Sequence, residues 1–542
     1  MNIQFNLKNN LVDNKFSLII RILWTLFVFY SIYTLSFVYP FEAKSIFITS
    51  IVAIVLALFG NGFVFSIYFL FIFLLSLFES HFLRVYGFSF ELISKQIVSV
   101  FFDSNKGEII SYLKIISIKE FLLLGIAILF SVLGFFSHPI IINFLKLFRN
   151  SKKNILKFNS SVCFIISLMI ALAGILTGMP KVYVNFIQQI SISDSQSQLR
   201  AQNLKLKKQF KWHSESSQNS PKNVIIIIGE SHRRDYFFQS WNMLARLDNE
   251  YDFSNMISQY SYTLKALPQI ISRKPFNYPV DEFYESSLFK LYEEAGYTTH
   301  YICYLPVNWF GDGAINYFVS ETQNYYHYDE NSSRKSKINV DDMEVLPIIK
   351  KIVANDSKNF IVVKLIGVHY NFEDRYYKED DIIRPSLKDN QVETKAENKQ
   401  IYINTYINAM NYSTKVIHSI FEYVDTLKSP SIICFLSDHG FNIFDDGNWN
   451  MGSSKKAFEI PFIIKANNSY LKHRNLSKWN NLGKHIKDAL ISNDVFETIV
   501  SLSEIKRPNI YNYDLTSEKI RTSKREVLLP GDKVEFEEDL KY

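Results

Sequence analysis

The chain is poor in the residue types that mark several classes of protein. It has three cysteines among 542 residues, with 18 glycines and 14 prolines. So few cysteines exclude a small disulfide-stapled scaffold, and so little glycine and proline exclude collagen-like repeats and low-complexity disorder. Cys163, Cys303 and Cys434 each lie in an apolar run, where a thiol packs as a small hydrophobic side chain. Cysteine usage therefore does not indicate the redox compartment.

Charge of one sign is also scarce. Lysine and arginine number 59 against 53 aspartates and glutamates, which gives a formal net charge of +6. No block of basic residues interleaved with aromatic residues suggests a groove that follows a phosphate backbone. We therefore expect no nucleic-acid partner.

Apolar residues are abundant, at 48% of the chain with 47 phenylalanines, and they are concentrated in the first third. Five stretches there approach the length of about 20 residues that crosses a bilayer as a helix. They are residues 19–39, 45–59, 63–78, 121–145 and 162–179. The second and third stretches, joined by Gly60-Asn61-Gly62, predict a tight helical hairpin. A buried helix of a soluble protein is the alternative for each stretch alone, but five together favour a transmembrane domain of five spans over residues 1–180.

Basic residues near the stretches predict their orientation. Lys8, Lys15 and Arg21 precede the first stretch, and five lysines and arginines lie within residues 146–157, between the fourth and fifth. Because lysine and arginine flank spans on the cytoplasmic side, both regions should be cytoplasmic. Five crossings then place everything after Met179 outside, and residues 79–120 become an external loop.

The second half has the pattern of a water-soluble domain. Residues 181–221 are polar and predict a linker, and residues 516–542, rich in lysine and glutamate, predict a polar tail. Between them, residues 222–515 alternate short β-branched runs with amphipathic stretches of helix length. The runs are residues 224–228, 299–304, 360–366, 432–436 and 460–464. This alternation predicts an α/β domain with a mainly parallel sheet, in which ligands bind at the carboxyl ends of the strands.

Acidic residues and histidines follow three of these runs. Glu230 follows the first, His369 follows residues 360–366, and Asp438 and His439 follow residues 432–436. A carboxylate and imidazole set suits a borderline divalent ion such as zinc. Each residue alone has an ordinary explanation, as a capping carboxylate or a hydrogen-bonded core histidine. Their shared position at strand ends favours a metal site.

Several motifs in order give the chain a family resemblance. Residues 224–235, 254–268, 366–369 and 437–440 resemble the membrane-bound phosphoethanolamine transferases of the alkaline phosphatase/sulfatase superfamily. Weaker similarities occur at Asn105-Lys-Gly-Glu108 and at residues 402–407. The resemblance extends over nearly the whole chain. It implies a multi-pass protein of the inner (cytoplasmic) membrane with a periplasmic, alkaline-phosphatase-like catalytic domain.

The resemblance also implies roles for single residues. Thr263, eight residues after Asn255 and five before Pro268, matches the nucleophile of the family. Glu230, Asp438 and His439 match the residues that, with Thr263, bind the divalent metal, zinc above others. His369 matches a catalytic histidine that contacts the transferred group, and the implied substrate-binding residues are His369, Arg233, Asn105 and Glu108. From the residues alone, a helix N-cap is the alternative for Thr263, with Ser261 as the competing nucleophile. The alternative for Arg233 is a solvated charge.

These roles imply a reaction. A divalent cation lowers the pKa of a hydroxyl enough to make it a nucleophile toward phosphorus. The implied activity is transfer of phosphoethanolamine from phosphatidylethanolamine to an envelope glycolipid, lipid A or the lipopolysaccharide core, through a covalent phospho-threonine. A phosphoglycerol transferase or related hydrolase on the same fold, and a catalytically silent membrane scaffold, are the alternatives. The presence of all four metal and nucleophile residues favours an enzyme.

The chain also departs from the family pattern. Met451 stands where familiar members carry a histidine about a dozen residues after the Asp-His-Gly motif. Because a thioether is a poor zinc ligand and cannot transfer a proton, the sequence gives no support for a second metal or an additional phosphate contact at this position and leaves the question open. The chain also lacks the disulfides of the best-known members, which weakens assignment to a subfamily more than assignment of the fold.

Overall fold

The computed structural model describes residues 19–27, 43–59, 61–86, 118–136, 160–178, 206–207, 209–277, 283–304, 318–327, 341–390, 392, 394–447, 449–450, 454–472, 476–508, 514–518, 524–529 and 533–540. Asn105, Glu108 and Met451 lie outside these residues, as does the basic cluster within residues 146–157. The chain divides into two compact units, Met1–Ile93 with Lys114–Ser191 and Ser94–Leu113 with Ile192–Tyr542. Each unit is described by itself.

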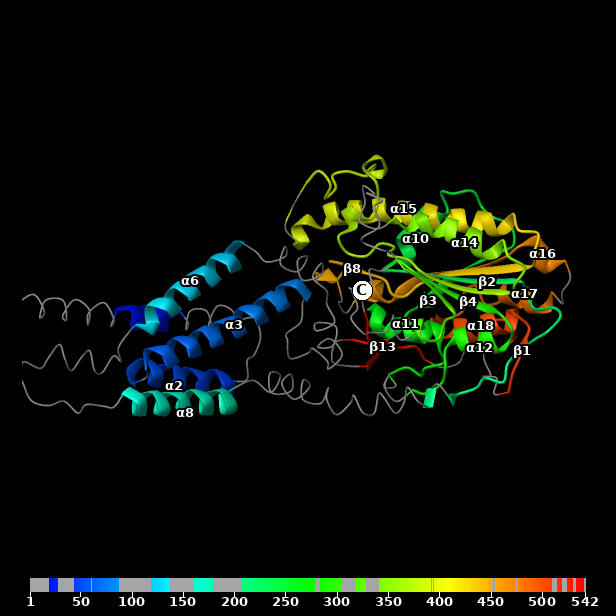
Figure 1. The fold of residues 1–542 in the computed structure, drawn as a ribbon. Helices are drawn as coiled ribbons and strands as arrows, with labels where there is room; N and C mark the ends of the chain where they lie inside the picture. Colours follow the sequence, from blue (N-terminus) through cyan, green and yellow to red (C-terminus); the bar gives the residue numbers. More distant parts are fainter. Residues whose placement is uncertain are drawn as a thin grey trace, which may run out of the picture. The chain divides into compact units, whose positions relative to one another are not determined.

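The described part of the first unit is helical. Residues 19–27 form a helix, followed by α2 (Ala43–Phe59), α3 (Gly62–Tyr86), α6 (Ile118–Phe135) and α8 (Ser160–Gly178) (Figure 1). Each helix overlaps one of the five apolar stretches. The expected hairpin is confirmed, because α2 and α3 contact each other and are separated only by residues 60 and 61. Helix α3 continues beyond the expected end at Phe78, since no glycine or proline interrupts the chain before Gly87.

Aromatic side chains fill the centre of this helical unit. Trp24, Phe65 and Phe69 are buried there, and the Trp24 ring stacks on Phe130 with centroids 5.5 Å apart. Arg21, expected as a charge flanking a span, is instead buried beside the last turn of α2. Its Nη1 donates to the carbonyl oxygens of Leu56 and Ala57 at 3.1 and 3.0 Å. The last carbonyls of a helix lack partners within the helix and attract a cation, which explains this position.

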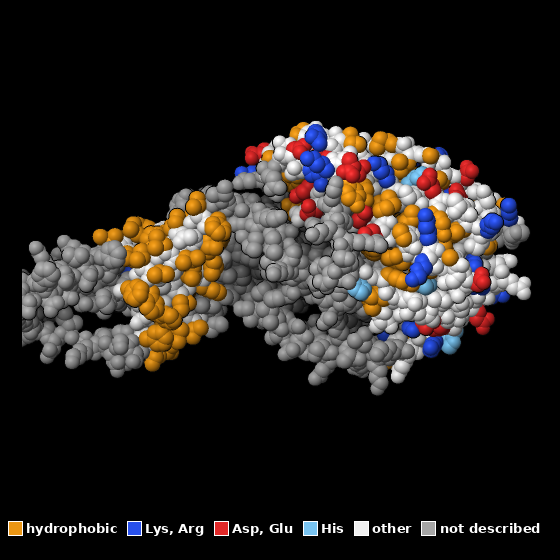
Figure 2. Space-filling view, turned by 45° about the horizontal axis from the view of Figure 1, so that its top comes forward, with side chains coloured by type: hydrophobic (Ala, Val, Ile, Leu, Met, Phe, Trp, Pro, Cys, Tyr) orange, Lys and Arg blue, Asp and Glu red, His pale blue; other side chains and the backbone are white. Residues whose placement is uncertain are grey.

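Apolar side chains also cover the outside of the helical unit (Figure 2). Phe121 is 71% exposed and Met169 66% exposed, for example. Among the helical residues that the structure describes, none forms a stretch that is both long enough and apolar enough to qualify as a membrane span. The five spans therefore stay a prediction.

The second unit is built on an eight-stranded sheet with the order β11-β3-β10-β7-β2-β6-β4-β5. Its strands are β2 (Asn223–Gly229), β3 (Glu250–Ile257), β4 (Thr298–Cys303), β5 (Asn324–His327), β6 (Asn359–Lys364), β7 (Ser431–Ser437), β10 (Glu459–Ala466) and β11 (Leu490–Ile491). The described strands of this sheet pair in parallel, except that β10 runs antiparallel to β3 and β7. The expected α/β domain with a mainly parallel sheet is thus confirmed.

All five runs expected from the sequence occur as strands. Strand β6 ends at Lys364, two residues before the expected end, because the amides of Ile366 and Gly367 donate to the carboxylate of Asp342. Strand β10 differs from the expectation of parallel pairing. Composition alone does not encode the direction of a strand that is buried on both faces.

Helices cover both faces of the sheet (Figure 1). One face carries α10 (Arg234–Trp241), α14 (Val345–Val353) and α15 (Lys399–Asp425), and the other carries α11 (Thr263–Ile271), α12 (Leu288–Glu294) and α18 (Asp494–Leu502). Two shorter helices, α16 (Asn468–Leu471) and α17 (Ser477–Leu482), follow β10. Every residue of β2, β6 and β7 is buried, as expected for central strands covered on two sides.

Two polar segments at the margins of this domain also take part in its fold. Near the end of the expected linker, β1 (Glu215–Ser216) pairs with β12 (Ile505–Lys506), and Trp212 is buried against Phe496. Within the expected tail, β13 (Glu526–Leu528) pairs with β14 (Lys533–Glu535). Val527, Phe536 and Leu540 of this segment pack with Ile257 and Phe458. The described parts of both segments therefore add to the core.

Candidate active site

The register of the central strands brings three strand ends to one edge of the sheet. Gly229 of β2 pairs with Ser437 of β7, and Ile228 of β2 pairs with Lys364 of β6. Glu230 and Asp438, the residues that follow β2 and β7, are therefore level with each other. Lys364 stands beside them at the end of β6.

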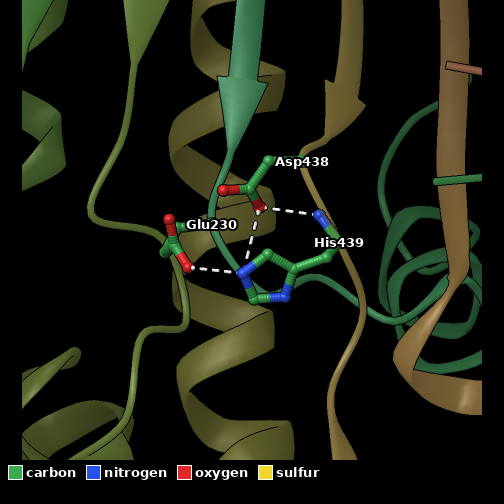
Figure 3. Close-up of side chains that lie close together, drawn as sticks. All are labelled: Glu230, Asp438 and His439. Atoms are coloured by element: carbon green, nitrogen blue, oxygen red, sulfur yellow. Dashed lines mark hydrogen bonds and ion pairs between the residues drawn. The ribbon is translucent and has the colours of Figure 1, made fainter. Parts of the chain in front are cut away.

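Glu230, Asp438 and His439 form a buried cluster at this edge (Figure 3). His439 Nε2 lies 3.2 Å from Glu230 Oε1 and 3.9 Å from Asp438 Oδ1. One ligand atom from each residue falls within 4.8 Å of the others. Among the described residues, this is the group of histidine, cysteine and acidic side chains that fits a metal ion, and its oxygen and nitrogen donors suit zinc.

Thr263 reaches the same cluster as the first residue of α11. Its Oγ1 donates to Glu230 Oε2 at 2.9 Å and lies 3.4 Å from His439 Nε2. The N-cap of α11 is Tyr262, so Thr263 is not the helix cap that its sequence also allows. At this end of a helix the unpaired amides favour negative charge, which favours an ionised oxygen here. These contacts favour Thr263 over Ser261 as the nucleophile.

His439 is oriented by the backbone. Its Nδ1 lies 2.7 Å from the carbonyl oxygen of Gly440, which can only accept, so Nδ1 bears hydrogen and Nε2 faces the carboxylates. Burial opposes protonation of the ring, but Asp438 and Glu230 raise the pKa of His439 to about 9. A cation bound at Nε2 would therefore replace a proton there, which couples metal binding to proton release.

Lys364 also belongs to the site, although the sequence motifs did not indicate it. Its ammonium donates to Glu230 Oε2 at 2.7 Å and to Asp438 Oδ2 at 2.9 Å. Burial opposes ionisation of Glu230, but Lys364 and His439 hold the pKa of that carboxyl well below its usual range. The sequence carries a signal for this residue, since a lysine inside a continuous apolar run must be buried with partners.

The turn after β2 is held in a strained shape around the cluster. Ser231 has a φ of 62°, its amide donates to Asp438 Oδ1 at 3.2 Å, and its hydroxyl donates to Glu230 Oε1 at 3.0 Å. The Tyr406 hydroxyl, within the weakly matching segment 402–407, donates to the Ser231 carbonyl oxygen at 2.6 Å. Backbone strain of this kind persists only where neighbouring contacts enforce it.

Arg233 and His369 stand differently toward the cluster. The guanidinium of Arg233 is buried and paired with Asp235 and Asp445, at 2.7 and 2.8 Å, so its contacts are those of a structural ion pair. Its substrate-binding role stays a prediction. His369 is partly exposed beside the cluster, and burial of much of its imidazole, with a smaller effect of Arg375, lowers the pKa of this group to about 4. Its contact with the transferred group stays a prediction.

The catalytic half of the chain matches a known family. Residues 222–505, more than half of the chain, match the Sulfatase family. The chain belongs to the sulfatase family. The cluster of Glu230, Thr263, Asp438 and His439 therefore lies within the sulfatase domain.

Curated relatives of this sulfatase-family chain are phosphoethanolamine transferases. EptC of Escherichia coli K12 is 23% identical over 274 residues, which are 46% of this chain and 46% of that protein. EptA of Helicobacter pylori is 24% identical over 273 residues, 47% of this chain and 50% of that protein. The aligned part thus spans about half the length of these relatives. The resemblance to the phosphoethanolamine transferases is confirmed.

Solved structures share the fold. The integral membrane lipooligosaccharide phosphoethanolamine transferase A of Neisseria meningitidis matches with a TM-score of 0.62 and 15% identity, over 90% of this chain and 96% of that one. The periplasmic domain of Escherichia coli EptC, in a complex with zinc, matches with a TM-score of 0.52 and 17% identity, over 60% of this chain and 95% of that one. This chain therefore has the same fold as these solved enzymes.

Proposed function

We propose that the chain is a membrane-bound transferase that moves phosphoethanolamine from phosphatidylethanolamine to an envelope glycolipid, lipid A or the lipopolysaccharide core. The observation that supports this most directly is the contact of Thr263 Oγ1 with Glu230 Oε2 and His439 Nε2, at 2.9 and 3.4 Å. A buried hydroxyl beside a carboxylate and an imidazole is an arrangement that suits a nucleophile in covalent phosphoryl transfer. The names of the curated relatives support the choice of ethanolamine as the head group.

In the first step, Thr263 Oγ1 attacks the phosphorus of phosphatidylethanolamine. A bond forms between Oγ1 and phosphorus, the bond from phosphorus to the glycerol oxygen breaks, and diacylglycerol leaves. Glu230 Oε2 accepts the hydrogen bond of the hydroxyl and so orients Oγ1. The hydroxyl proton is lost to solvent as the new bond forms, and the departing glycerol oxygen gains a proton. In the second step, a hydroxyl or phosphate oxygen of the acceptor attacks the phospho-threonine and releases Thr263.

Glu230, Thr263, Asp438 and His439 would hold a divalent cation, with zinc the best fit to their oxygen and nitrogen donors. Such a cation supplies positive charge that stabilises the ionised Thr263 oxygen and the phosphate oxygens. The solved complex of the Escherichia coli EptC domain with zinc supports this choice of metal. His369 is proposed to bind the phosphate or to protonate the leaving oxygen, and Arg233, Asn105 and Glu108 to contact the substrate.

We further propose that residues 1–180 form five membrane spans with residues 79–120 external, and that the catalytic domain, residues 222–515, is periplasmic. The exposed apolar side chains of the helical unit, among them Phe121, Leu122 and Met169, support a lipid environment. The similarity to an integral membrane enzyme over 90% of the chain also supports it. A lipid donor and a lipid-anchored acceptor would both be available at that membrane surface.

Mass spectrometry of envelope lipids tests the proposal. Cells that carry the gene should contain a glycolipid heavier by one ethanolamine phosphate unit, and cells without the gene or with Thr263→Ala should lack it. Purified enzyme should transfer label from ethanolamine-labelled phosphatidylethanolamine and not from glycerol-labelled phosphatidylglycerol. Transfer of the glycerol label would identify a phosphoglycerol transferase, and an unchanged glycolipid in Thr263→Ala cells would favour a silent scaffold.

A further inference from the structure

Lys364, beside the cluster, has all its hydrogen bonds in place without a metal or substrate. Its side chain is fully buried. Its ammonium donates to the Gly229 carbonyl oxygen at 2.8 Å, to Glu230 Oε2 at 2.7 Å and to Asp438 Oδ2 at 2.9 Å. A lysine ammonium has three hydrogens, so these acceptors use all of them.

The contacts divide the carboxylate oxygens between two sides. Lys364 binds Oε2 of Glu230 and Oδ2 of Asp438, whereas Oε1 and Oδ1 are the oxygens nearest His439 Nε2. One oxygen of each carboxylate is therefore held by the lysine, and the other faces the imidazole. The lysine, together with Ser231, therefore orients both carboxylates before any metal binds.

The charges give the lysine a second effect. Two ionised carboxylates buried side by side repel each other and are costly to remove from water, so a cation between them stabilises the fold. The same cation repels a divalent ion that binds the other oxygens of the same carboxylates, because both positive charges lie within a few ångströms in a medium of low dielectric.

We propose that Lys364 is a positioning residue that acts as a resident cation of the site. It holds the Glu230 and Asp438 carboxylates in place in the metal-free protein through its hydrogen bonds, and it limits how tightly the site binds a divalent cation. Removal of its charge then makes the fold depend on metal and makes the metal bind more tightly. This inference rests on the metal site of the proposed function.

The test compares metal binding in full-length variants purified in detergent, stripped with a chelator and titrated with Zn²⁺ alone. Lys364→Met keeps most of the side-chain length and removes the charge. Lys465→Met is the matched control, because Lys465 is fully buried and ion-paired to Asp425 at 3.0 Å. Lys465 pairs with Ile433 near the start of β7, away from the edge that carries the cluster.

We expect Lys364→Met to melt at a lower temperature than the wild type without metal and to gain a larger upward shift on addition of Zn²⁺. Its Zn²⁺ dissociation constant, measured by competition with a chromophoric chelator, should be at least about tenfold lower than that of the wild type. Lys465→Met should also melt at a lower temperature, but with the Zn²⁺ shift and dissociation constant of the wild type.

An unchanged or weaker Zn²⁺ affinity in Lys364→Met, with a wild type that binds Zn²⁺, would overturn the role of Lys364 and leave the metal site standing. A wild type without any Zn²⁺ shift would overturn the metal site and this inference with it. Lys364→Gln, a second neutral variant, should bind Zn²⁺ as tightly as Lys364→Met. In the proposal, Zn²⁺ takes over the stabilising charge of the lysine. Failure of both Lys364→Met and Lys364→Gln to fold with Zn²⁺ present would therefore also contradict the proposal.

Discussion

The hydroxyl of Thr263 is the smallest group on which the proposed reaction depends. Thr263→Ala removes the oxygen that forms the bond to phosphorus, so we expect head-group transfer to fall by at least about a thousandfold. Thr263→Ser keeps a hydroxyl at the start of α11 and should retain measurable transfer. The measurement is the rate at which equal amounts of each purified variant transfer labelled ethanolamine phosphate to an acceptor lipid.

A loss of folding would imitate this result, so stability is the control. Thr263→Ala removes one hydrogen bond to Glu230, which corresponds to about 1 kcal/mol in the free energy of unfolding. Near-normal transfer by a well-folded Thr263→Ala protein would rule out Thr263 as the nucleophile. If Thr263→Ala loses transfer and is also unfolded, Thr263 has a structural role.

His232 gives a pH dependence at the same scale. Burial, with a smaller effect of Lys364, lowers the pKa of its imidazole to about 3, and its Nε2 lies 2.8 Å from Ser413 Oγ. In the unfolded chain a histidine binds a proton below a pH of about 6.5, so the unfolded state binds more protons between the two values. Stability should therefore fall as the pH falls through this range, by up to about 1.4 kcal/mol per pH unit from this residue.

Chemical denaturation of the full chain at several pH values measures this effect. His232→Gln should reduce the loss of stability between pH 7 and pH 5, because the group that binds the extra proton on unfolding is gone. His213→Gln is the matched control, since His213 is exposed, and its pH dependence should equal that of the wild type. Equal pH dependence in His232→Gln and wild type would show that His232 does not cause the acid sensitivity.

At the scale of elements, the turn after β6 holds the edge of the sheet together. Gly367 has a φ of 52°, and a Cβ there would lie 2.6 Å from His232 Cε1 and 2.8 Å from the amide nitrogen of Glu230. Gly367→Ala should therefore push the turn against the residues that follow β2. We expect a loss of about 2 kcal/mol or more in the free energy of unfolding, with weaker Zn²⁺ binding.

Gly296→Ala separates the effect of the positive φ from the effect of the close contacts on the free energy of unfolding. Gly296 also has a positive φ, of 85°, but a Cβ there would meet no atom within 4 Å. Gly296→Ala should lose only about 1 kcal/mol in the free energy of unfolding, the cost of a positive φ for alanine, and should keep normal Zn²⁺ binding. If Gly367→Ala were no more damaging than Gly296→Ala, the close packing of the two turns would not position the site.

The same scale shows how much the sequence predicts. The central strands could be found because burial on both faces gives continuous apolar runs, and the cluster could be found because Glu230, Asp438 and His439 directly follow such runs. The edge strands β5 and β11 are short and carry no such run. The antiparallel direction of β10 has no local signal either.

Other features depend on contacts between distant parts of the chain. Residues 181–221 and 516–542 are polar in composition, so the burial of Trp212 and Phe536 within them could not be predicted. Their burial depends on the surfaces that these side chains contact. The partners of Lys364 come from the ends of β2 and β7, at positions set by sheet register. Side-chain type predicts that such residues need partners, but only the three-dimensional arrangement identifies them.

At the scale of the whole molecule, the proposed topology predicts on which side of the membrane each segment lies. A reporter enzyme that is active only outside the cytoplasm should be inactive when fused after Lys157 and active when fused after Arg200. The reason is that the basic residues within 146–157 should remain cytoplasmic, whereas one further span precedes residue 200. Activity at both positions, or at neither, would contradict five spans with an external catalytic domain.

The measurement that tests the central claim most directly is mass spectrometry of the protein itself after incubation with phosphatidylethanolamine and no acceptor. The proposed reaction predicts a phosphoethanolamine adduct on the peptide that contains Thr263, which tandem fragmentation assigns to that residue and which disappears when acceptor lipid is added. An adduct on Ser261 or elsewhere, or steady transfer by an enzyme that never carries an adduct, would contradict the account.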